Sequence, residues 1–289
     1  MVNIYMLVGL PCSGKSSWAK EQDGVWISSD RIREELYGNE SIQENPEKVF
    51  QVMWKRLCEA IEREEQFVIY DATNVVCKRR IAFCEQVRKK YGDKVKLIVC
   101  VFNTPIEECV RRAKERKERP LSESVIWKFV KSWQTPAYWE GWDSIKLFGE
   151  DNLDPLFYKM FEKVEGMDQK NKHHSLALDE HMIKAEKEVK KLLEKEGPLT
   201  WEISQKVLQA SRFHDIGKPL VQIFDEEGFA HYYAHENVSG YLTLGFGILT
   251  SSLITHHMDI FKKTKLLNKM NVPFRHYLEL MYQADVSAH

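Results

Sequence analysis

The chain has 289 residues, 43% of them hydrophobic, and its formal net charge at pH 7 is −1. This composition excludes the disordered and collagen-like classes and leaves room for two domains of ordinary size. No apolar run approaches the 18 residues of a membrane-spanning helix, and the N-terminus lacks the basic segment of a secretory signal. The six cysteines lie between Cys12 and Cys109 and form no C-x-x-C pair. We therefore expect a cytoplasmic protein with no membrane partner and no disulfides.

Residues 1–150 alternate short apolar runs with helical stretches. The runs typical of buried strands are IYMLV, GVWIS, QFVIYD, KVKLIVCVF and SIKLF. This alternation predicts an α/β domain whose parallel sheet has helices on both faces. In such folds ligands bind at the carboxyl ends of the strands, so the polar residues that follow the strands are the candidate site residues.

The segment GLPCSGKSS, which follows the first run, fits the phosphate-loop pattern G-x-x-x-x-G-K-[ST]. Backbone N–H groups of such a loop and of the next helix face bound phosphates. Lys15 is expected to reach the β- and γ-phosphates of ATP, and Ser16 to ligate Mg²⁺. The ATP-binding residues predicted from the loop are Gly9, Ser13, Gly14, Lys15, Ser16 and Ser17.

Charged residues follow the second and third predicted strands. Asp30 comes just after the second strand and Arg33 lies one helical turn later. Asp30 is suited to accept the proton of an attacking hydroxyl, or alternatively to cap the helix. Asp71 ends the third strand, where a carboxylate is expected to associate with Mg²⁺. Farther along, RRAKER places Arg112 and Arg116 four residues apart, which predicts a shared helical face.

Charge is distributed unevenly within this first half. Residues 78–128 contain 15 Lys/Arg and 7 Asp/Glu, whereas residues 21–71 contain 6 Lys/Arg and 13 Asp/Glu. The basic region forms either a surface that attracts phosphates or a set of solvated helix faces. Within it begins the segment 115–136, which is first charged and then amphipathic. We expect this segment to be a helical lid over the nucleotide.

Four segments together, GLPCSGKSSWAKE, SSDRIREEL, YDATN with the downstream Arg80, and RRAKER, resemble the polynucleotide 5′-kinase family of P-loop phosphotransferases. The resemblance spans about residues 1–142. It implies transfer of the γ-phosphate of ATP to a 5′-hydroxyl end of RNA or DNA.

The same resemblance implies a role for each matched residue. Lys15 and Ser16 would handle phosphates and Mg²⁺, Asp30 would be the general base, and Arg33 would engage the acceptor and the base. Arg116 would be the lid arginine. Arg112 is the other match and is assigned to the ATP site. Related P-loop kinases that phosphorylate antibiotics, sugars or nucleotide sugars share the loop and an Asp after the second strand.

The sequence changes character after about residue 148. Strand patterns stop, residues 151–172 are expected to form a linker, and residues 173–289 show the apolar spacing of helices. All ten histidines lie from His173 onward. We therefore expect a second, all-α domain that uses histidine.

The second half contains the adjacent pair His214 and Asp215 in HDIGK. Imidazoles together with carboxylates suit first-row transition metals, and the helices of a bundle can direct such ligands to one centre. The alternative for His181, which lies on an apolar helix face, is a buried core histidine. The candidate metal ligands are His181, His214, Asp215, His235, His257 and Asp285.

This ordered set resembles the HD phosphohydrolase superfamily of all-helical metal enzymes over about residues 173–289. The resemblance implies that one metal ion is held by His181, His214, Asp215 and Asp285, and that His235 and His257 help to hold a second. The mixed His/carboxylate set favours Mn²⁺, Co²⁺ or Ni²⁺.

Three further residues are candidates for contact with the substrate. Lys218, one turn after the His-Asp pair, is placed to meet a non-bridging phosphate oxygen. His174 and His256 are candidate substrate contacts, and His256 is the alternative to His257 as a ligand.

The two halves together predict a bifunctional enzyme of nucleic-acid end healing, in RNA repair and with an RNA ligase as partner. Cleavage of RNA by its own 2′-hydroxyl leaves a 5′-hydroxyl and a 2′,3′-cyclic phosphate, whereas ligation needs a 5′-phosphate and a free 3′-hydroxyl. The alternatives are a small-molecule or nucleotide kinase fused to an HD nucleotidase, and an ATP-gated sensor of nucleotides or RNA.

Overall fold

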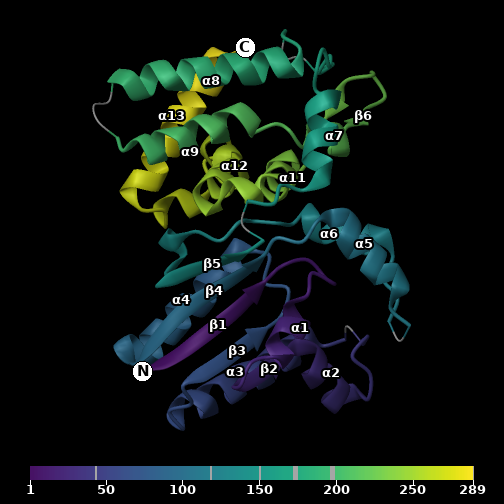
Figure 1. Cartoon of the computed structure of the whole chain (residues 1–289), viewed down its shortest axis with the longest axis vertical. Helices are drawn as coiled ribbons and strands as arrows, with labels where there is room; N and C mark the ends of the chain where they lie inside the picture. The colour runs from purple at the N-terminus through teal and green to yellow at the C-terminus, as the bar shows by residue number, and fades with distance from the viewer. Residues whose placement is uncertain (43, 118, 150, 172–174, 196–198, 289) are drawn as a thin grey trace. The chain divides into compact units, whose positions relative to one another are not determined.

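The computed structural model describes residues 1–42, 44–117, 119–149, 151–171, 175–195 and 199–288. The chain forms two compact units, which are labelled in Figure 1 by their helices and strands. The sheet unit consists of Met1–Ile126 and Glu140–Phe148, and the helical unit of Trp127–Trp139 and Gly149–His289. Each unit is described by itself below.

The sheet unit is built on a five-stranded sheet in the order β2-β3-β1-β4-β5. Every neighbouring pair of strands is parallel. The strands are β1 (Val2–Val8), β2 (Val25–Ser28), β3 (Phe67–Asp71), β4 (Val95–Phe102) and β5 (Ser144–Phe148). These five strands coincide with the five apolar runs, so the predicted parallel α/β sheet is confirmed.

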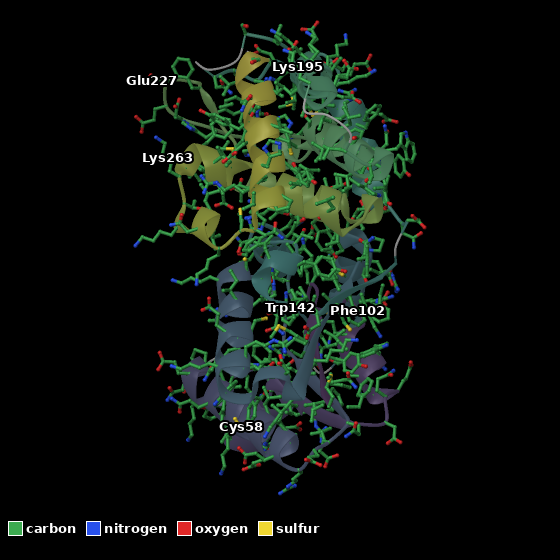
Figure 2. All side chains as sticks on the ribbon, turned by 90° about the vertical axis from the view of Figure 1, so that its left-hand side faces the viewer. Cys58, Phe102, Trp142, Lys195, Glu227 and Lys263 are labelled. Atoms are coloured by element: carbon green, nitrogen blue, oxygen red, sulfur yellow. The ribbon has the colours of Figure 1, made fainter. Side chains whose placement is uncertain are left out.

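Helices cover both faces of this sheet. On one face, Trp18 of α1 contacts Phe67 of β3 and Phe102 of β4, the latter labelled in Figure 2. On the other face, Phe83 of α4 packs on Tyr70 of β3 at a ring distance of 4.8 Å. Phe67 and Tyr70 are an odd number of residues apart on one strand, so their side chains point to opposite faces. The α-helices that contribute to the unit are α1 (Lys15–Lys20), α2 (Ser29–Tyr37), α3 (Pro46–Glu62), α4 (Cys77–Tyr91), α5 (Ile106–Glu115) and the start of α6 (Glu123–Val130).

A buried ion pair joins α4 to the return segment of the sheet unit. Arg80 is fully buried, and its guanidinium donates to both oxygens of Glu140 at 2.8 and 2.7 Å. It also donates to the carbonyl of Asn74. Arg80 is part of the kinase-like sequence pattern. In the structure it connects α4 to Glu140 and Asn74, and it has no exposed surface for a ligand.

The helical unit is a bundle with one short hairpin. Its α-helices are the end of α6, α7 (Pro155–Lys163), α8 (Leu178–Lys195), α9 (Trp201–Phe213), α10 (Lys218–Val221), α11 (His235–Leu242), α12 (Ile248–Lys262) and α13 (Val272–Ser287). Helix α8 packs against α9 and α13, and α12 packs against α9, α11 and α13. Their apolar faces share one core that includes Val189, Leu253 and Leu278.

Two expectations for the second half and one for residues 115–136 need correction. The prediction of no strand there is wrong, because β6 (Ile223–Phe224) and β7 (Ala230–His231) pair around a turn whose Gly228 has a φ of 85°. Two-residue strands are too short to leave a period-2 pattern. Residues 151–172 are more than a linker, because they contain α7, whose buried Phe157 contacts Phe213 and Phe246.

The third correction concerns the expected lid at residues 115–136. From Trp127 onward this segment belongs to the helical unit. Trp133 is fully buried against Tyr241 and donates to Thr135, whose hydroxyl hydrogen-bonds Ser251. These contacts tie the segment into the bundle core, so it is not a free lid. No helix in the described part of the chain is both long and apolar enough to cross a membrane.

Candidate functional sites

The phosphate-loop sequence forms the turn between β1 and α1. Cys12 and Gly14 have φ values of 64° and 92°, so the backbone twice enters the left-handed region. Gly14 suits this conformation because it has no Cβ. A Cβ at Gly9 would lie 2.6 Å from Oγ of Ser13 and 3.1 Å from Cβ of Phe102, so a larger residue there would require the Ser13 hydroxyl to move. Such a turn at a helix N-terminus directs N–H groups toward an anion.

The ammonium of Lys15 lies on the inner side of this loop. It donates to the carbonyls of Gly9 and Leu10 at 2.9 and 2.6 Å and to Oγ of Ser13 at 3.3 Å. Burial lowers the pKa of Lys15, and the nearby carboxylates of Asp71 and Asp30 oppose that shift. The predicted loop residues are thus brought together around one cation.

Asp71 lies at the carboxyl end of β3, beside the start of α1. Its Oδ2 accepts hydrogen bonds from Oγ of Ser16 and Nε1 of Trp26, both at 3.0 Å. Burial raises the pKa of Asp71, whereas Lys15 and the two donors lower it. The exposed Ser16 hydroxyl and this carboxylate are hard oxygen donors of the kind that Mg²⁺ prefers, so the pair fits a Mg²⁺ ion. Ser17 is exposed on the same helix.

Asp30 lies in the first turn of α2 and is not its cap. The cap is Ser28, whose Oγ accepts from the backbone N–H of Arg31. The alternative role of Asp30 as a helix cap is therefore wrong. Its side chain is 43% exposed, and Oδ1 accepts from Nη1 of the largely buried Arg33 at 2.8 Å. The carboxylate is thus fixed by Arg33 through Oδ1 and remains partly exposed.

The two candidate arginines after β4, Arg112 and Arg116, occupy different positions. Arg112 reaches the phosphate loop, where its Nη1 donates to the carbonyl of Cys12. Arg116 comes after the end of α5 at Glu115 and donates to Glu40 at 3.2 Å. Because the helix stops there, the expected common face of Arg112 and Arg116 is wrong.

Sequence reasoning did not identify Arg119, whose guanidinium lies 3.4 Å from Oδ2 of Asp30. Its side chain is only 16% exposed. The one signal in the sequence was its place as a further basic residue in ERKERP, and this did not separate it from its neighbours.

Much of the charge in the basic region is paired within the sheet unit. Among the described residues, Arg88 pairs with Asp143, Lys90 with Glu62, Arg111 with Glu108 and Glu115, and Lys114 with Glu123. The basic side chains of residues 78–128 therefore do not form a continuous surface of unpaired charge.

The predicted ligands of the helical unit converge from four helices and the segment after α9. His181 comes from α8, His214 and Asp215 follow α9, His235 begins α11, His257 lies in α12 and Asp285 in α13. The helices that carry them are labelled in Figure 1. The four histidines and Asp215 are buried.

Asp215 lies at the centre of this cluster. On one side, its Oδ2 is 3.3 Å from Nε2 of His214 and 3.7 Å from Nε2 of His181. On the other side, its Oδ1 is 3.1 Å from Nε2 of His235 and 4.0 Å from Nε2 of His257. The ligand atoms of each trio lie within 4.8 Å of one another, a spacing that could hold a metal ion. One carboxylate is thus shared by two potential metal positions.

Asp285 extends the first of these groups. Its Oδ1 lies 3.0 Å from Nε2 of His181 and 3.6 Å from Nε2 of His214. All four residues of the first predicted ligand set are therefore brought together.

The orientation of the histidines fits a metal ion. Nδ1 of His214, His235 and His257 lies 2.8, 2.8 and 2.7 Å from the backbone carbonyls of Ser211, Tyr232 and Ile254. A carbonyl oxygen only accepts, so Nδ1 carries the proton and Nε2 presents a lone pair in the neutral ring. The Nε2 atoms of His235 and His257 are 3.3 Å apart. Lone pairs that face each other and carboxylate oxygens at such distances are favourable when a cation lies between them.

The charges of the cluster are strongly coupled. Burial lowers the pKa of His214, but the carboxylates of Asp215 and Asp285 outweigh burial and raise it to about 10. Burial, together with the neighbouring His214 and His235, lowers the pKa of His257 to about 4. Burial raises the pKa of Asp215, but the surrounding cations hold it well below its usual value. The carboxylates of Asp215 and Asp285 therefore stabilise a positive charge placed next to them in this cluster.

The remaining candidates are placed differently. Lys218 is buried, with its Nζ 2.7 Å from Oδ2 of Asp215 and 2.7 Å from Oε1 of Gln169. His256 is fully buried, pairs with Asp259 and packs against Trp139, so the expectation that it contacts a substrate is wrong. His174 lies outside the described residues.

A narrow cleft, with room for about one water molecule, lies beside the cluster. It is lined by Ser211, His214, His257, Phe261, Met281, Tyr282 and Asp285.

Comparison with known proteins bears on the sheet unit. The family described as an AAA domain matches residues 4–136, which is less than half of the chain. No curated protein matches the sequence.

Two similar solved structures bear the names "Structure of Pnkp1/Rnl/Hen1 complex" and "Structure of the Pnkp1/Rnl/Hen1 RNA repair complex". The first is 23% identical with a TM-score of 0.32, and the match covers 42% of this chain and 45% of that one. The second is 20% identical with a TM-score of 0.38, covering 45% of this chain and 43% of that one. This chain thus spans less than half the length of either structure. Residues 4–136 thus match the family described as an AAA domain, and the turn between β1 and α1 has the geometry of a phosphate loop.

Proposed function

We propose that this protein is a bifunctional nucleic-acid end-healing enzyme. The sheet unit would transfer the γ-phosphate of ATP to a 5′-hydroxyl end. The helical unit would remove a 3′-phosphate or 2′,3′-cyclic phosphate. The observation that carries the proposal is the presence of two polar centres, a phosphate-loop turn around Lys15 and a cluster of histidines and carboxylates around Asp215.

The kinase half depends on the geometry of Asp30. Its carboxylate is fixed by Arg33, approached by Arg119 and exposed enough to meet an incoming hydroxyl. Asp30 would accept the hydroxyl proton while Lys15 stabilises charge on the transferred phosphoryl group. Ser16 and Asp71 would hold a Mg²⁺ ion, which would supply positive charge beside the phosphates of ATP. Arg112 would contact the nucleotide, since it already reaches the loop at Cys12.

The hydrolase half depends on the ligand set around Asp215. His181, His214, Asp215 and Asp285 would hold one divalent ion, and His235 and His257 would help to hold a second. Such ions lower the pKa of water and stabilise the attacking and leaving oxygens of a phosphoester. The backbone carbonyls that accept from Nδ1 keep the imidazoles oriented. Lys218 would stabilise the negative charge that Asp215 carries beside the substrate phosphate.

The two activities are chemically complementary. Together they would convert the ends left by RNA self-cleavage, a 5′-hydroxyl and a 2′,3′-cyclic phosphate, into a 5′-phosphate and a 3′-hydroxyl. These are the ends that a ligase joins, so an RNA ligase is the partner that would consume the product.

One observation favours a second candidate, a small-molecule or nucleotide kinase joined to a nucleotidase. The ion pairs of Arg111, Lys114 and Arg88 neutralise much of the basic region that would attract a polynucleotide. A small acceptor would not need such a surface.

A direct assay separates the two candidates. ATP labelled at the γ-phosphate is offered with Mg²⁺ to 5′-hydroxyl RNA and DNA oligonucleotides and, in parallel, to a panel of nucleosides, sugars and aminoglycosides. The proposal predicts label on the oligonucleotides. Label confined to the small molecules would replace it with the second candidate.

The hydrolase half has its own test. Oligonucleotides that end in 3′-phosphate or 2′,3′-cyclic phosphate are incubated with Mn²⁺, Co²⁺ or Ni²⁺, and the protein as purified is analysed for metal. We expect phosphate release and bound transition metal. A metal-free protein that is inactive with every divalent ion would contradict this half alone.

A further inference from the structure

The cleft at the histidine cluster has an aromatic wall that the proposed chemistry does not use. Phe261, near the end of α12, and Tyr282 of α13 line the same cleft as His214, His257 and Asp285. Their rings meet edge to face with centroids 4.7 Å apart.

These two rings are not core residues. Phe261 is 37% exposed and Tyr282 is 36% exposed, although both are large hydrophobic side chains. Exposed aromatic rings beside a polar centre are typical of a binding surface. An edge-to-face pair keeps one ring face available for stacking on a further planar group.

Basic residues follow Phe261 directly. Lys263 and Lys265 are exposed, and Figure 2 labels Lys263 at the periphery of the helical unit. Lys262 pairs with Glu236. Exposed lysines thus follow an aromatic ring of the cleft along the chain, and planar rings with nearby cations are the combination that binds single-stranded nucleic acid.

We propose that Phe261 and Tyr282 stack on the last nucleobase of a single strand whose 3′-terminal phosphate lies at the mouth of the cleft, while Lys263 and Lys265 meet its backbone phosphates. This inference rests on the proposed hydrolase function and names its substrate class. It distinguishes an oligonucleotide end from a small phosphoester, because a small phosphoester has neither the base nor the following backbone.

The test uses the full chain and two matched oligonucleotides with a 3′-phosphate, one with a normal last nucleotide and one whose last position lacks the base. The readout is the ratio of kcat/KM for the two substrates. In the unmodified protein the base should raise kcat/KM about tenfold, within the range of base–aromatic stacking. Phe261→Leu combined with Tyr282→Leu keeps apolar volume and should reduce the ratio to about one.

Tyr158→Leu is the matched control, because Tyr158 is an exposed aromatic residue of α7 that does not line the cleft. It should leave the ratio unchanged. A double variant that retains the full preference for the base would overturn the proposal, and so would an unmodified protein with no preference.

Binding separates this inference from the proposed hydrolase. Fluorescence anisotropy of the same oligonucleotides without added metal should show tighter binding when the last base is present, and the double variant should lose that difference. If no phosphoester is hydrolysed but the base-dependent binding persists, the hydrolase is wrong and the stacking site stands. If hydrolysis occurs without base-dependent binding, the stacking site is wrong and the hydrolase stands.

Discussion

The two candidate sites assemble their charges in opposite ways. In the sheet unit, one loop of nine residues supplies the cation Lys15, and its partners are mainly carbonyls of the same loop. In the helical unit, Asp215 meets imidazoles from helices that are far apart in the sequence. The phosphate loop is a local structure at the carboxyl end of the central strand β1. The histidine cluster, in contrast, forms only when the helices of the bundle have packed together.

This difference predicts how each site responds to the loss of one group. Removing a side chain from the loop leaves the backbone curve in place, because Gly9 and Gly14 determine it. Removing the shared carboxylate of the helical site leaves several buried nitrogen groups without their common counter-charge. Variants in each unit therefore test whether the two sites are independent.

The largest effect is expected for Asp215→Ala. Asp215 contacts His214, His235 and Lys218, so its loss removes the group shared by both potential metal positions. We expect bound metal and phosphohydrolase activity to be lost, while ATP-dependent transfer continues. Metal analysis and both activity assays on one preparation measure this result.

Asp225→Ala is the control, because Asp225 is an exposed carboxylate of the hairpin turn that pairs with His231. It should retain the metal. If Asp215→Ala keeps metal and hydrolysis, the assigned centre is wrong; if it also stops the kinase, the two units are not independent.

Lys15→Ala should produce the opposite pattern. Loss of the only side-chain ammonium on the inner side of the described loop removes charge stabilisation from the transferred phosphoryl group. Kinase transfer should become undetectable, with unchanged hydrolysis and circular dichroism. Lys20→Ala, an exposed lysine at the other end of α1, should behave like the unmodified protein. Substantial transfer by the Lys15 variant would contradict the role of the loop.

Asp30→Asn should have a smaller effect, because the amide keeps the size of the side chain and removes only its ability to accept a proton. Transfer should fall by roughly 10²–10⁴-fold, the contribution of a general base. Nucleotide affinity should change little, since Asp30 is not part of the loop. Single-turnover rates and ATP titrations separate the two quantities, with the exposed Asp23→Asn as control. A nearly unchanged rate would exclude Asp30 as the base.

The contrast between local and assembled structure also explains what the sequence could predict. The five strands and the phosphate loop follow from runs of neighbouring residues, and the parallel sheet was predicted correctly. The end of α5 at Glu115 was not predicted, because the next residue is Arg116 and not a glycine or proline that would mark the end of a helix. Arg119 contacts Asp30 only through the fold of a loop, and no local pattern records such a contact.

In the helical unit, residue types indicated the ligands but not their arrangement. His256 and His257 are adjacent residues of the same type, so the sequence alone does not tell them apart. Their different directions around α12 bring His257 to Asp215 and His256 to Trp139. The membership of residues 127–139 in the bundle depends on Trp133 packing against Tyr241. Such long-range contacts leave no periodic signal.

The smallest effect on activity, but a clear effect on stability, is expected for Arg80→Met. Arg80 and Glu140 form a fully buried pair, so the variant leaves the Glu140 carboxylate buried with its hydrogen bond from Trp142 but without its counter-charge. Breaking such a pair costs about 3–5 kcal/mol of the free energy of unfolding. The loss should concern the sheet unit, because both partners belong to it. Under conditions in which the protein remains folded, the hydrolase should be unaffected, whereas heat should inactivate the kinase at a lower temperature than in the unmodified protein.

Arg111→Met is the matched control, because the Arg111 ion pairs are exposed and such pairs add little to stability. Measurement of residual kinase and hydrolase activity after stepwise heating tests both points. Equal loss of the two activities would show that the units unfold as one, and the independence inferred from their separate centres would then be wrong.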